Sequence, residues 1–212
     1  MIATKPLIIS AVRFEAEATL ASLDPKMYDY VELGIGPVHA LVGALKLREQ
    51  ATGRQVLYIG SAGTFGEFKE PYLTQVKRVW WLPTAERMGM AKYMPNLYPP
   101  LEMTKRTDLG LPDCEVFTST SVSLSALTSV IDSRLPALEE SVENMEAYCV
   151  VAQLLPVVSQ LDILLGISNQ VGSKGSEQWQ TNFRKVAELS AHFIARRSFG
   201  QETSQRVPSE NS

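Results

Sequence analysis

Residues 163–179 read ILLGISNQVGSKGSEQW and pass from an apolar run into a polar segment that contains glycine. The run 163–168 is short and apolar, which is typical of a strand buried on both faces of a parallel sheet. It ends at Asn169. Asn often ends strands because it favours turns, so this residue by itself fits either a turn or a ligand site at the strand tip.

Apolar runs alternate with helical patterns along the rest of the chain. We predict strands at residues 6–12, 30–33, 56–59, 74–82, 115–123 and 163–168. We predict helices at residues 15–23, 38–50, 137–155 and 177–197. Strands interleaved with helices indicate a layered α/β domain with a largely parallel sheet.

Two segments fall outside this alternation. Residues 84–113 contain several prolines together with Met88, Met90, Met94, Tyr93 and Tyr98. The segment is too long for an ordinary connection, so it is an excursion over the surface, a lid or a subunit contact. Residues 201–212 are polar, and we expect a disordered tail.

Composition narrows the function classes. The net charge of −3 over 212 residues gives no reason to expect a nucleic-acid surface or a polybasic membrane contact. Two cysteines and two histidines without ligand spacing predict neither a disulfide framework nor a metal site, and we expect no cofactor. The sequence shows neither a secretory signal nor an apolar run of bilayer length, so we expect a soluble cytoplasmic protein.

Several predicted strands end in polar or glycine-rich residues, where open α/β sheets bind ligands. These ends hold Glu15, the Gly34–Gly36 turn, residues 60–66 and the pair Ser168 and Asn169. A glycine turn is either a plain tight turn or a backbone that a ligand can approach closely. The dinucleotide fingerprint and the ATP phosphate loop are both absent from the sequence.

Glu146 lies in the predicted helix 137–155 among apolar neighbours. Burying a carboxylate there without a partner is unfavourable. The residue is therefore either a rim glutamate with its head group in water or a carboxylate that binds ligand hydroxyls from within a pocket.

Five segments together resemble the superfamily of purine nucleoside phosphorylases and methylthioadenosine/adenosylhomocysteine nucleosidases. They are IISAVRFEAE (8–17), ELGIGPVHA (32–40), YIGSAGTFG (58–66), SVENMEAYCVVAQ (141–153) and LGISNQVG (165–172). They occur in the order the superfamily has. The resemblance implies a three-layer α/β/α domain at residues 1–200 with a central mixed, largely parallel sheet, and a homo-oligomer of two or more chains.

The resemblance also implies site roles. Glu15 would activate water at the anomeric carbon, and Asn169 would stabilise the departing base. Glu146 would hold the ribose hydroxyls, with Met145 packed against the sugar. The remaining residues expected to bind substrate are Ser61, Ala62, Gly63, Val122, Ser123 and Ser168.

The nucleosidases of this superfamily carry Asp where this chain has Asn169. An amide cannot act as a general acid, but it offers one donor and one acceptor side, which match a 6-oxopurine protonated at N7. With Ser168, Gly172 and Trp179, Asn169 gives a signature that most resembles the futalosine hydrolase branch. That branch releases hypoxanthine in menaquinone biosynthesis.

Alternatives remain. One is a methylthioadenosine/adenosylhomocysteine nucleosidase or a purine phosphorylase, and another is a non-catalytic nucleoside-binding protein. No segment matches the arginine segments that bind phosphate in the phosphorylases, and Glu15 would repel phosphate. Arg13 is either a surface residue or a neighbour of Glu15 in the site. These observations favour hydrolysis of a purine nucleoside.

Overall fold

The computed structural model describes residues 5–87, 91–92, 94, 96–124 and 135–197. These residues form a mixed α/β domain, as predicted. Its elements are β1 (Leu7–Ser10), α1 (Arg13–Ser22), β2 (Asp29–Glu32), α2 (Gly36–Ala51), β3 (Gln55–Thr64), β4 (Tyr72–Trp81), α3 (Thr84–Arg87), β5 (Leu101–Glu102), β6 (Asp113–Thr118), η1 (Leu138–Glu140), β7 (Ser141–Glu143), α4 (Ala147–Leu154), β8 (Gln160–Gln170) and α5 (Gly175–Ala195).

The strands form one central sheet in the order β2-β1-β3-β7-β6-β4-β5, with β8 paired to both β3 and β4. Five of the eight pairings between described strands are parallel, which agrees with the predicted mixed, largely parallel sheet. Strands β3, β8, β4, β6 and β7 pair in a closed ring. The sequence did not predict this closure, which brings strand ends from both halves of the chain to one region.

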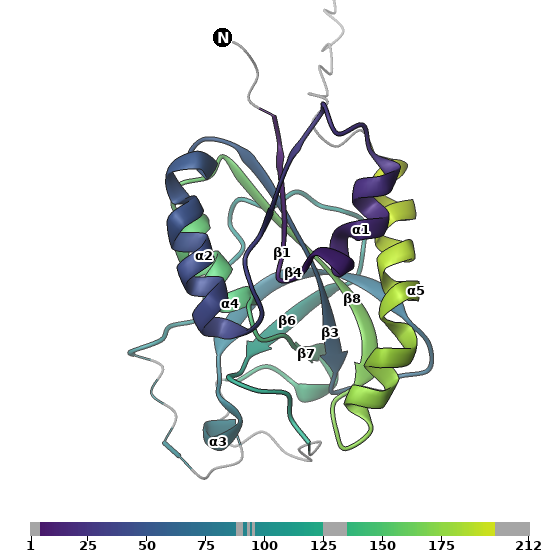
Figure 1. Cartoon of the computed structure of the whole chain (residues 1–212). Coiled ribbons are helices and arrows are strands. Elements are labelled where there is room, and N and C mark those ends of the chain that lie inside the picture. The colour runs from purple at the N-terminus through teal and green to yellow at the C-terminus, as the bar shows by residue number, and fades with distance from the viewer. Residues whose placement is uncertain (1–4, 88–90, 93, 95, 125–134, 198–212) are drawn as a thin grey trace, which may run out of the picture.

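Helices flank the sheet in two pairs (Figure 1). Helix α2 packs against α4, and α1 packs against α5. Helix α2 turns the small residues Ala40, Ala44 and Ala51 inward, and all three are fully buried. The small side chains let the helix lie close to its neighbours, and burying its apolar face supplies the main stabilisation.

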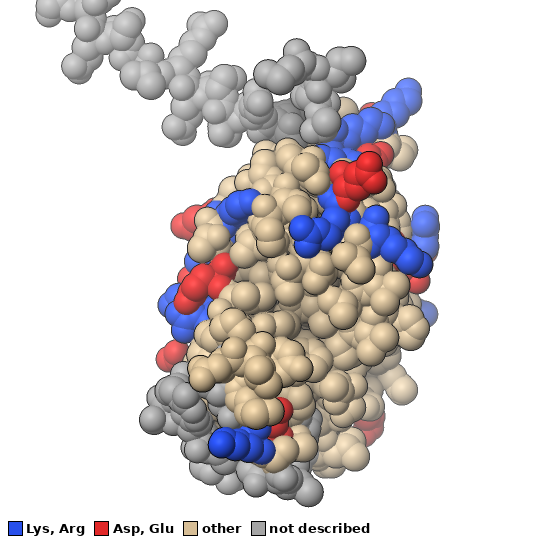
Figure 2. Space-filling view, turned by 90° about the vertical axis from the view of Figure 1, so that its left-hand side faces the viewer, with Lys and Arg blue, Asp and Glu red and all other residues tan. Residues whose placement is uncertain are grey.

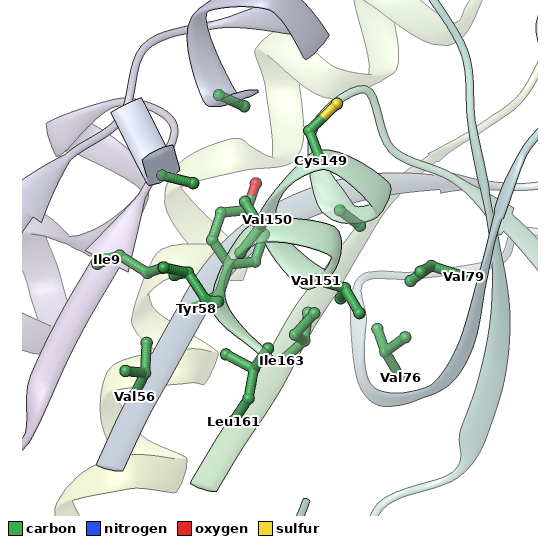
Figure 3. Packing of buried hydrophobic residues seen from close by; sticks show 14 of the residues in the cluster. Ile9, Val56, Tyr58, Val76, Val79, Cys149, Val150, Val151, Leu161 and Ile163 are labelled. Atoms are coloured by element: carbon green, nitrogen blue, oxygen red, sulfur yellow. The ribbon is translucent and has the colours of Figure 1, made fainter. Parts of the chain in front are cut away.

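The largest core cluster joins the two central parallel strands to α4. Tyr58 of β3 and Ile163 of β8 lie beneath Val150 and Val151 of the helix (Figure 3). All four side chains are nearly or fully buried. Buried and exposed residues therefore do not alternate along β3 and β8, which is the pattern expected of strands that are covered on both faces of the sheet.

The prediction of one helix over residues 137–155 is wrong. The first part of this segment is the short helix η1 followed by β7, and only Ala147–Leu154 is α-helical. Strand β7 pairs with β3 and β6, which are distant in the sequence. Long-range pairing overrides the local apolar pattern here, which suits a strand or a helix about equally.

Two strand ends also differ from prediction. The expected turn at residues 60–66 is largely strand, because β3 continues to Thr64 and pairs with β8 along its length. The predicted strand 115–123 ends at Thr118.

The segment 84–113 holds α3 and β5. Tyr98 packs against Trp81 with ring centroids 6.0 Å apart. The predictions for Met88, Met90, Tyr93 and the tail 201–212 lie outside the described residues. Within the described ranges, no helix combines the length and apolar character needed to cross a membrane.

Candidate active site

A cavity of about 360 Å³ opens where β3, β7 and β8 end and α1, α4 and α5 begin. Eight of the residues predicted for the site line it: Glu15, Ser61, Ala62, Gly63, Val122, Met145, Glu146 and Asn169. The other two predicted residues, Ser123 and Ser168, do not line it but hydrogen-bond to residues that do. The structure therefore brings all the predicted residues to one place.

Glu15 lies in the first turn of α1 and is fixed by Ser61. Its Oε1 accepts hydrogen bonds from the Ser61 amide at 3.0 Å and from the Ser61 hydroxyl at 2.6 Å. Its Oε2 is buried and has no hydrogen-bond partner among the described residues. Burial raises the pKa of Glu15 to about 7, with a contribution from the charge of Glu146, although the Ser61 hydrogen bonds lower it. A carboxylate with this pKa can take up a proton near neutral pH.

Glu146 precedes α4 and is 5 % exposed. Its Oε1 accepts a hydrogen bond of 2.8 Å from the Gly36 amide at the start of α2. The φ of Gly36 is +81°, which glycine adopts freely. Burial raises the pKa of Glu146, and the Gly36 amide and the nearby Tyr58 hydroxyl counter this effect. The carboxylate thus lies at the N-terminus of α2, whose dipole favours its charged form.

Asn144 holds these parts together, and the sequence analysis gave it no role. Its Oδ1 accepts hydrogen bonds from the amides of Glu146 and Ala147, at 3.0 and 2.8 Å. Its Nδ2 donates to the Ser61 carbonyl at 3.0 Å. Asn144 thereby caps α4 and ties the Glu146 segment to the Ser61 strand. An Asn just before a helix is a capping signal, but the predicted longer helix obscured it.

Asn169 reaches the cavity through a bulge. Ala62 pairs with Ile167 but Gly63 pairs with Asn169, so Ser168 is an extra residue in β8. A Cβ at Gly63 would lie 2.7 Å from the Asn169 Nδ2, so only glycine leaves room for this amide. The Ser168 hydroxyl donates to the Asn169 Oδ1 at 2.8 Å, which sets the orientation of the amide.

Aromatic rings form one wall of the cavity. Trp179 of α5 stacks on Phe183 with centroids 5.3 Å apart, and the edge of Phe14 meets both rings. The Trp179 indole N–H donates to the Ser61 hydroxyl oxygen at 3.0 Å. The sequence analysis noted Trp179 only as part of a signature and missed Phe14, whose position beside Glu15 in α1 was the available signal.

Glu143 at the end of β7 also had no predicted role. It is 7 % exposed and lines the cavity. Its carboxylate accepts hydrogen bonds from the Ser123 amide and hydroxyl and from the Ser119 hydroxyl. These bonds hold the loop that places Val122 at the cavity.

Three carboxylates therefore line the cavity, whereas none of its described lining residues is Lys or Arg. Arg13 is exposed, and its guanidinium lies over the Tyr30 ring, 5.7 Å from the centroid. No cluster of three or more potential metal ligands occurs among the described residues. The arrangement suits a neutral or cationic group, with the Oε2 of Glu15 available to accept a proton.

No protein-family model matches the sequence. No curated protein matches it either. Solved structures do resemble the fold. A Helicobacter pylori 5′-methylthioadenosine/S-adenosylhomocysteine nucleosidase in complex with a pyrrolopyrimidine-bearing pyrrolidine has a TM-score of 0.68 at 16 % identity. The match covers 92 % of this chain and 97 % of that one.

Two further structures give similar values. Futalosine hydrolase of H. pylori has a TM-score of 0.65 at 16 % identity, and 91 % of this chain and 96 % of that one are covered. A nucleosidase of the methylthioadenosine/adenosylhomocysteine type from S. pneumoniae, with a transition-state inhibitor, has a TM-score of 0.67 at 16 % identity, covering 91 % and 97 %. The chain thus has the fold of these nucleosidases.

Proposed function

We propose that the protein is a nucleosidase that hydrolyses the N-glycosidic bond of a purine nucleoside. The observation that carries the proposal is the convergence of Glu15, Glu146 and Asn169 on one cavity from three separate segments of the chain. The likeness in fold to nucleosidases supports it.

In this reaction a water oxygen attacks the anomeric carbon while the bond to the purine nitrogen breaks. The bonding electrons leave with the purine, and the water proton passes to Glu15. The departing purine takes up a proton at N7 from solvent, because the Asn169 amide cannot supply one. The buried and unpaired Oε2 of Glu15 is the atom suited to accept it. Its pKa of about 7 makes the carboxylate basic enough to accept the proton and still largely ionised at slightly alkaline pH.

The sugar gains positive charge in such a transition state, and Glu146 would stabilise it. One oxygen of Glu146 is held by the Gly36 amide. Its carboxylate would accept hydrogen bonds from ribose hydroxyls, with Met145 packed against the ring. Fixed charge near a developing positive centre is usually a large part of catalysis.

Water rather than phosphate is the proposed acceptor. Glu15, Glu143 and Glu146 all line the cavity, and their charge is unfavourable for a phosphate dianion. A phosphate pocket is normally built from arginine forks.

The proposed base is a 6-oxopurine, as in futalosine, whose hydrolysis releases hypoxanthine for menaquinone biosynthesis. The amide of Asn169 can donate to O6 and accept from a protonated N7. The second candidate is methylthioadenosine/adenosylhomocysteine hydrolysis, which the folds of the H. pylori and S. pneumoniae enzymes favour.

The test is incubation with futalosine, inosine, methylthioadenosine and adenosylhomocysteine in buffer with and without phosphate. Free hypoxanthine or adenine is then measured by chromatography. Base release that is independent of phosphate is the expected result. Release only with phosphate would indicate a phosphorylase, and tight binding without release would indicate a non-catalytic binding protein.

Replacing the amide tests the choice of base. Asn169→Asp is expected to lower the ratio of kcat/KM for futalosine over methylthioadenosine by about tenfold or more, since a lost hydrogen bond to a base discriminates strongly. The matched control is Gln178→Glu, which adds a carboxylate nearby on α5 outside the cavity lining. A ratio changed less than twofold by Asn169→Asp would contradict the assigned role.

We further propose that a second copy of the chain covers the outer face of α2. Val38, Leu41, Val42 and Leu45 recur at helical spacing there and are 70, 40, 44 and 57 % exposed. Figure 2 views the side on which α2 lies, and its charged side chains gather toward the margins. Apolar faces of this kind mark interfaces. Ile35, 56 % exposed at the start of the same helix, lines the cavity, so a second copy seated here would also border the site.

The parent is expected to show a light-scattering mass of at least twice the 23.4 kDa of one chain. Leu41→Glu places a charge within the exposed apolar face of α2. At micromolar concentration this variant is expected to show the light-scattering mass of one chain. Gln50→Glu, which adds the same charge on the exposed last turn of α2, is the control. A parent that is already monomeric would overturn the proposed pairing.

A further inference from the structure

We infer that Trp179 is a positioning residue that directs the hydroxyl proton of Ser61 to Glu15. The inference rests on the proposed role of Glu15 as the base. It concerns the contact between Trp179 and Ser61 in the cavity wall. Ser61 in turn contacts the carboxylate of Glu15.

Three atoms form a chain. The Trp179 Nε1 lies 3.0 Å from the Ser61 Oγ, and that Oγ lies 2.6 Å from the Glu15 Oε1. An indole N–H only donates, and an ionised carboxylate only accepts. The hydroxyl must therefore accept from Trp179 and give its single proton to Glu15. Without the indole, the hydroxyl could rotate and donate elsewhere.

The direction of the Ser61 hydroxyl proton matters because it points at the negative charge of the Glu15 carboxylate. The Ser61 hydroxyl bond is the strongest influence that lowers the pKa of Glu15, and burial opposes it. Among the described residues, Glu146, Tyr58 and Tyr30 interact electrostatically with Glu15. Glu146 raises the pKa of Glu15. A directed donor therefore helps to keep Glu15 ionised against its surroundings.

The bond also holds the carboxylate in place. With Oε1 fixed by the Ser61 amide and hydroxyl, Oε2 is left as the buried free oxygen. The indole is itself held by its stack on Phe183 and its contact with Phe14. The direction of the hydroxyl is thus set by a rigid aromatic wall rather than by a mobile side chain.

Trp179→Phe tests the inference because it keeps an aromatic ring and removes the N–H, and the Ser61→Ala background separates the loss of this donor from the smaller size of the ring. The pKa of Glu15 is measured by carboxyl ¹³C NMR titration of the full chain, with Glu15→Gln used to assign the signal. We expect Trp179→Phe to raise the Glu15 pKa by roughly half a unit and Ser61→Ala by about one unit. In the double variant Trp179→Phe with Ser61→Ala, the shift should equal that of Ser61→Ala alone, because both act through one hydroxyl.

The control is Trp80→Phe, which removes an indole hydrogen bond to Glu115 rather than to Ser61. It should leave the Glu15 titration unchanged. Equal shifts from Trp179→Phe in the parent and in the Ser61→Ala background would show that the ring acts by packing and overturn the inference. No shift in either would overturn it as well. Because the titration needs no turnover, these outcomes are distinct from a failure to detect nucleoside hydrolysis.

Discussion

Glu15→Gln is expected to lower kcat for base release by about 10²–10⁴-fold, the range that general-base catalysis contributes. The amide keeps an oxygen that can accept the Ser61 hydrogen bonds, so the shape of the cavity should survive. It cannot take a proton from water. KM should change little, because the variant removes an interaction that matters in the transition state and not in substrate binding. Initial rates of base release by chromatography measure both constants.

The pH profile of the parent gives an independent check of the same role. With a pKa of about 7, Glu15 is increasingly protonated as the pH falls below neutrality. The value of kcat/KM should therefore fall about tenfold per pH unit on the acid side of pH 7. Glu146→Gln removes the neighbouring charge that raises the pKa of Glu15. The residual kcat/KM of this variant should therefore begin to fall at a lower pH than that of the parent.

Glu17→Gln is the matched control, because Glu17 is exposed on the same helix α1. It should retain the parental rate and pH profile. A Glu15→Gln variant with more than about a tenth of parental kcat would show that another group activates the water.

The sequence located most of the site because its residues lie at strand ends and helix starts. Glu15 follows β1, Ser61 lies late in β3, and Asn169 lies near the end of β8. Parallel neighbouring strands bring such ends to one edge of a sheet. Predicted strand ends placed Glu15 and Asn169 at one edge of the sheet, and the resemblance to the nucleosidases supplied Ser61 and the roles of all three residues.

What could not be predicted depends on contacts distant along the chain. Strand β7 exists because β3 and β6 supply its hydrogen-bond partners, and nothing local separates its three residues from a helical turn. The role of Asn144 as a cap follows only once the helix is known to start at Ala147. The hydrogen bond from Trp179 to Ser61 spans 118 residues and depends on the approach of α5 to β3.

Glu15→Gln should lower activity but raise the free energy of unfolding. The gain in free energy of unfolding over the parent should depend on pH. The pKa of Glu15 rises from an ordinary 4.5 to about 7 on folding. Between these values the folded protein holds a proton that the unfolded chain has lost. Its free energy of unfolding therefore falls as the pH rises through this window, and the loss is complete above pH 7. The amide has no such proton.

We expect Glu15→Gln to resemble the parent near pH 4.5 and to be more stable than the parent at pH 8. The full difference between 4.5 and 7 corresponds to at most about 3 kcal/mol, so a gain of about 1–3 kcal/mol is expected. The repulsion between Glu15 and Glu146 is already part of this difference. Urea titrations at both pH values measure the free energy of unfolding, with Glu17→Gln as the exposed control on α1.

A gain that is equal at the two pH values would mean that Glu15 ionises in the folded protein as it does in water. The carboxylate would then be mostly charged at pH 5, and a base with a pKa near neutrality would be lost from the mechanism. A gain confined to the alkaline side would instead show that the cavity holds this carboxylate in an unfavourable charged state, as expected when a site favours a reaction over folding stability.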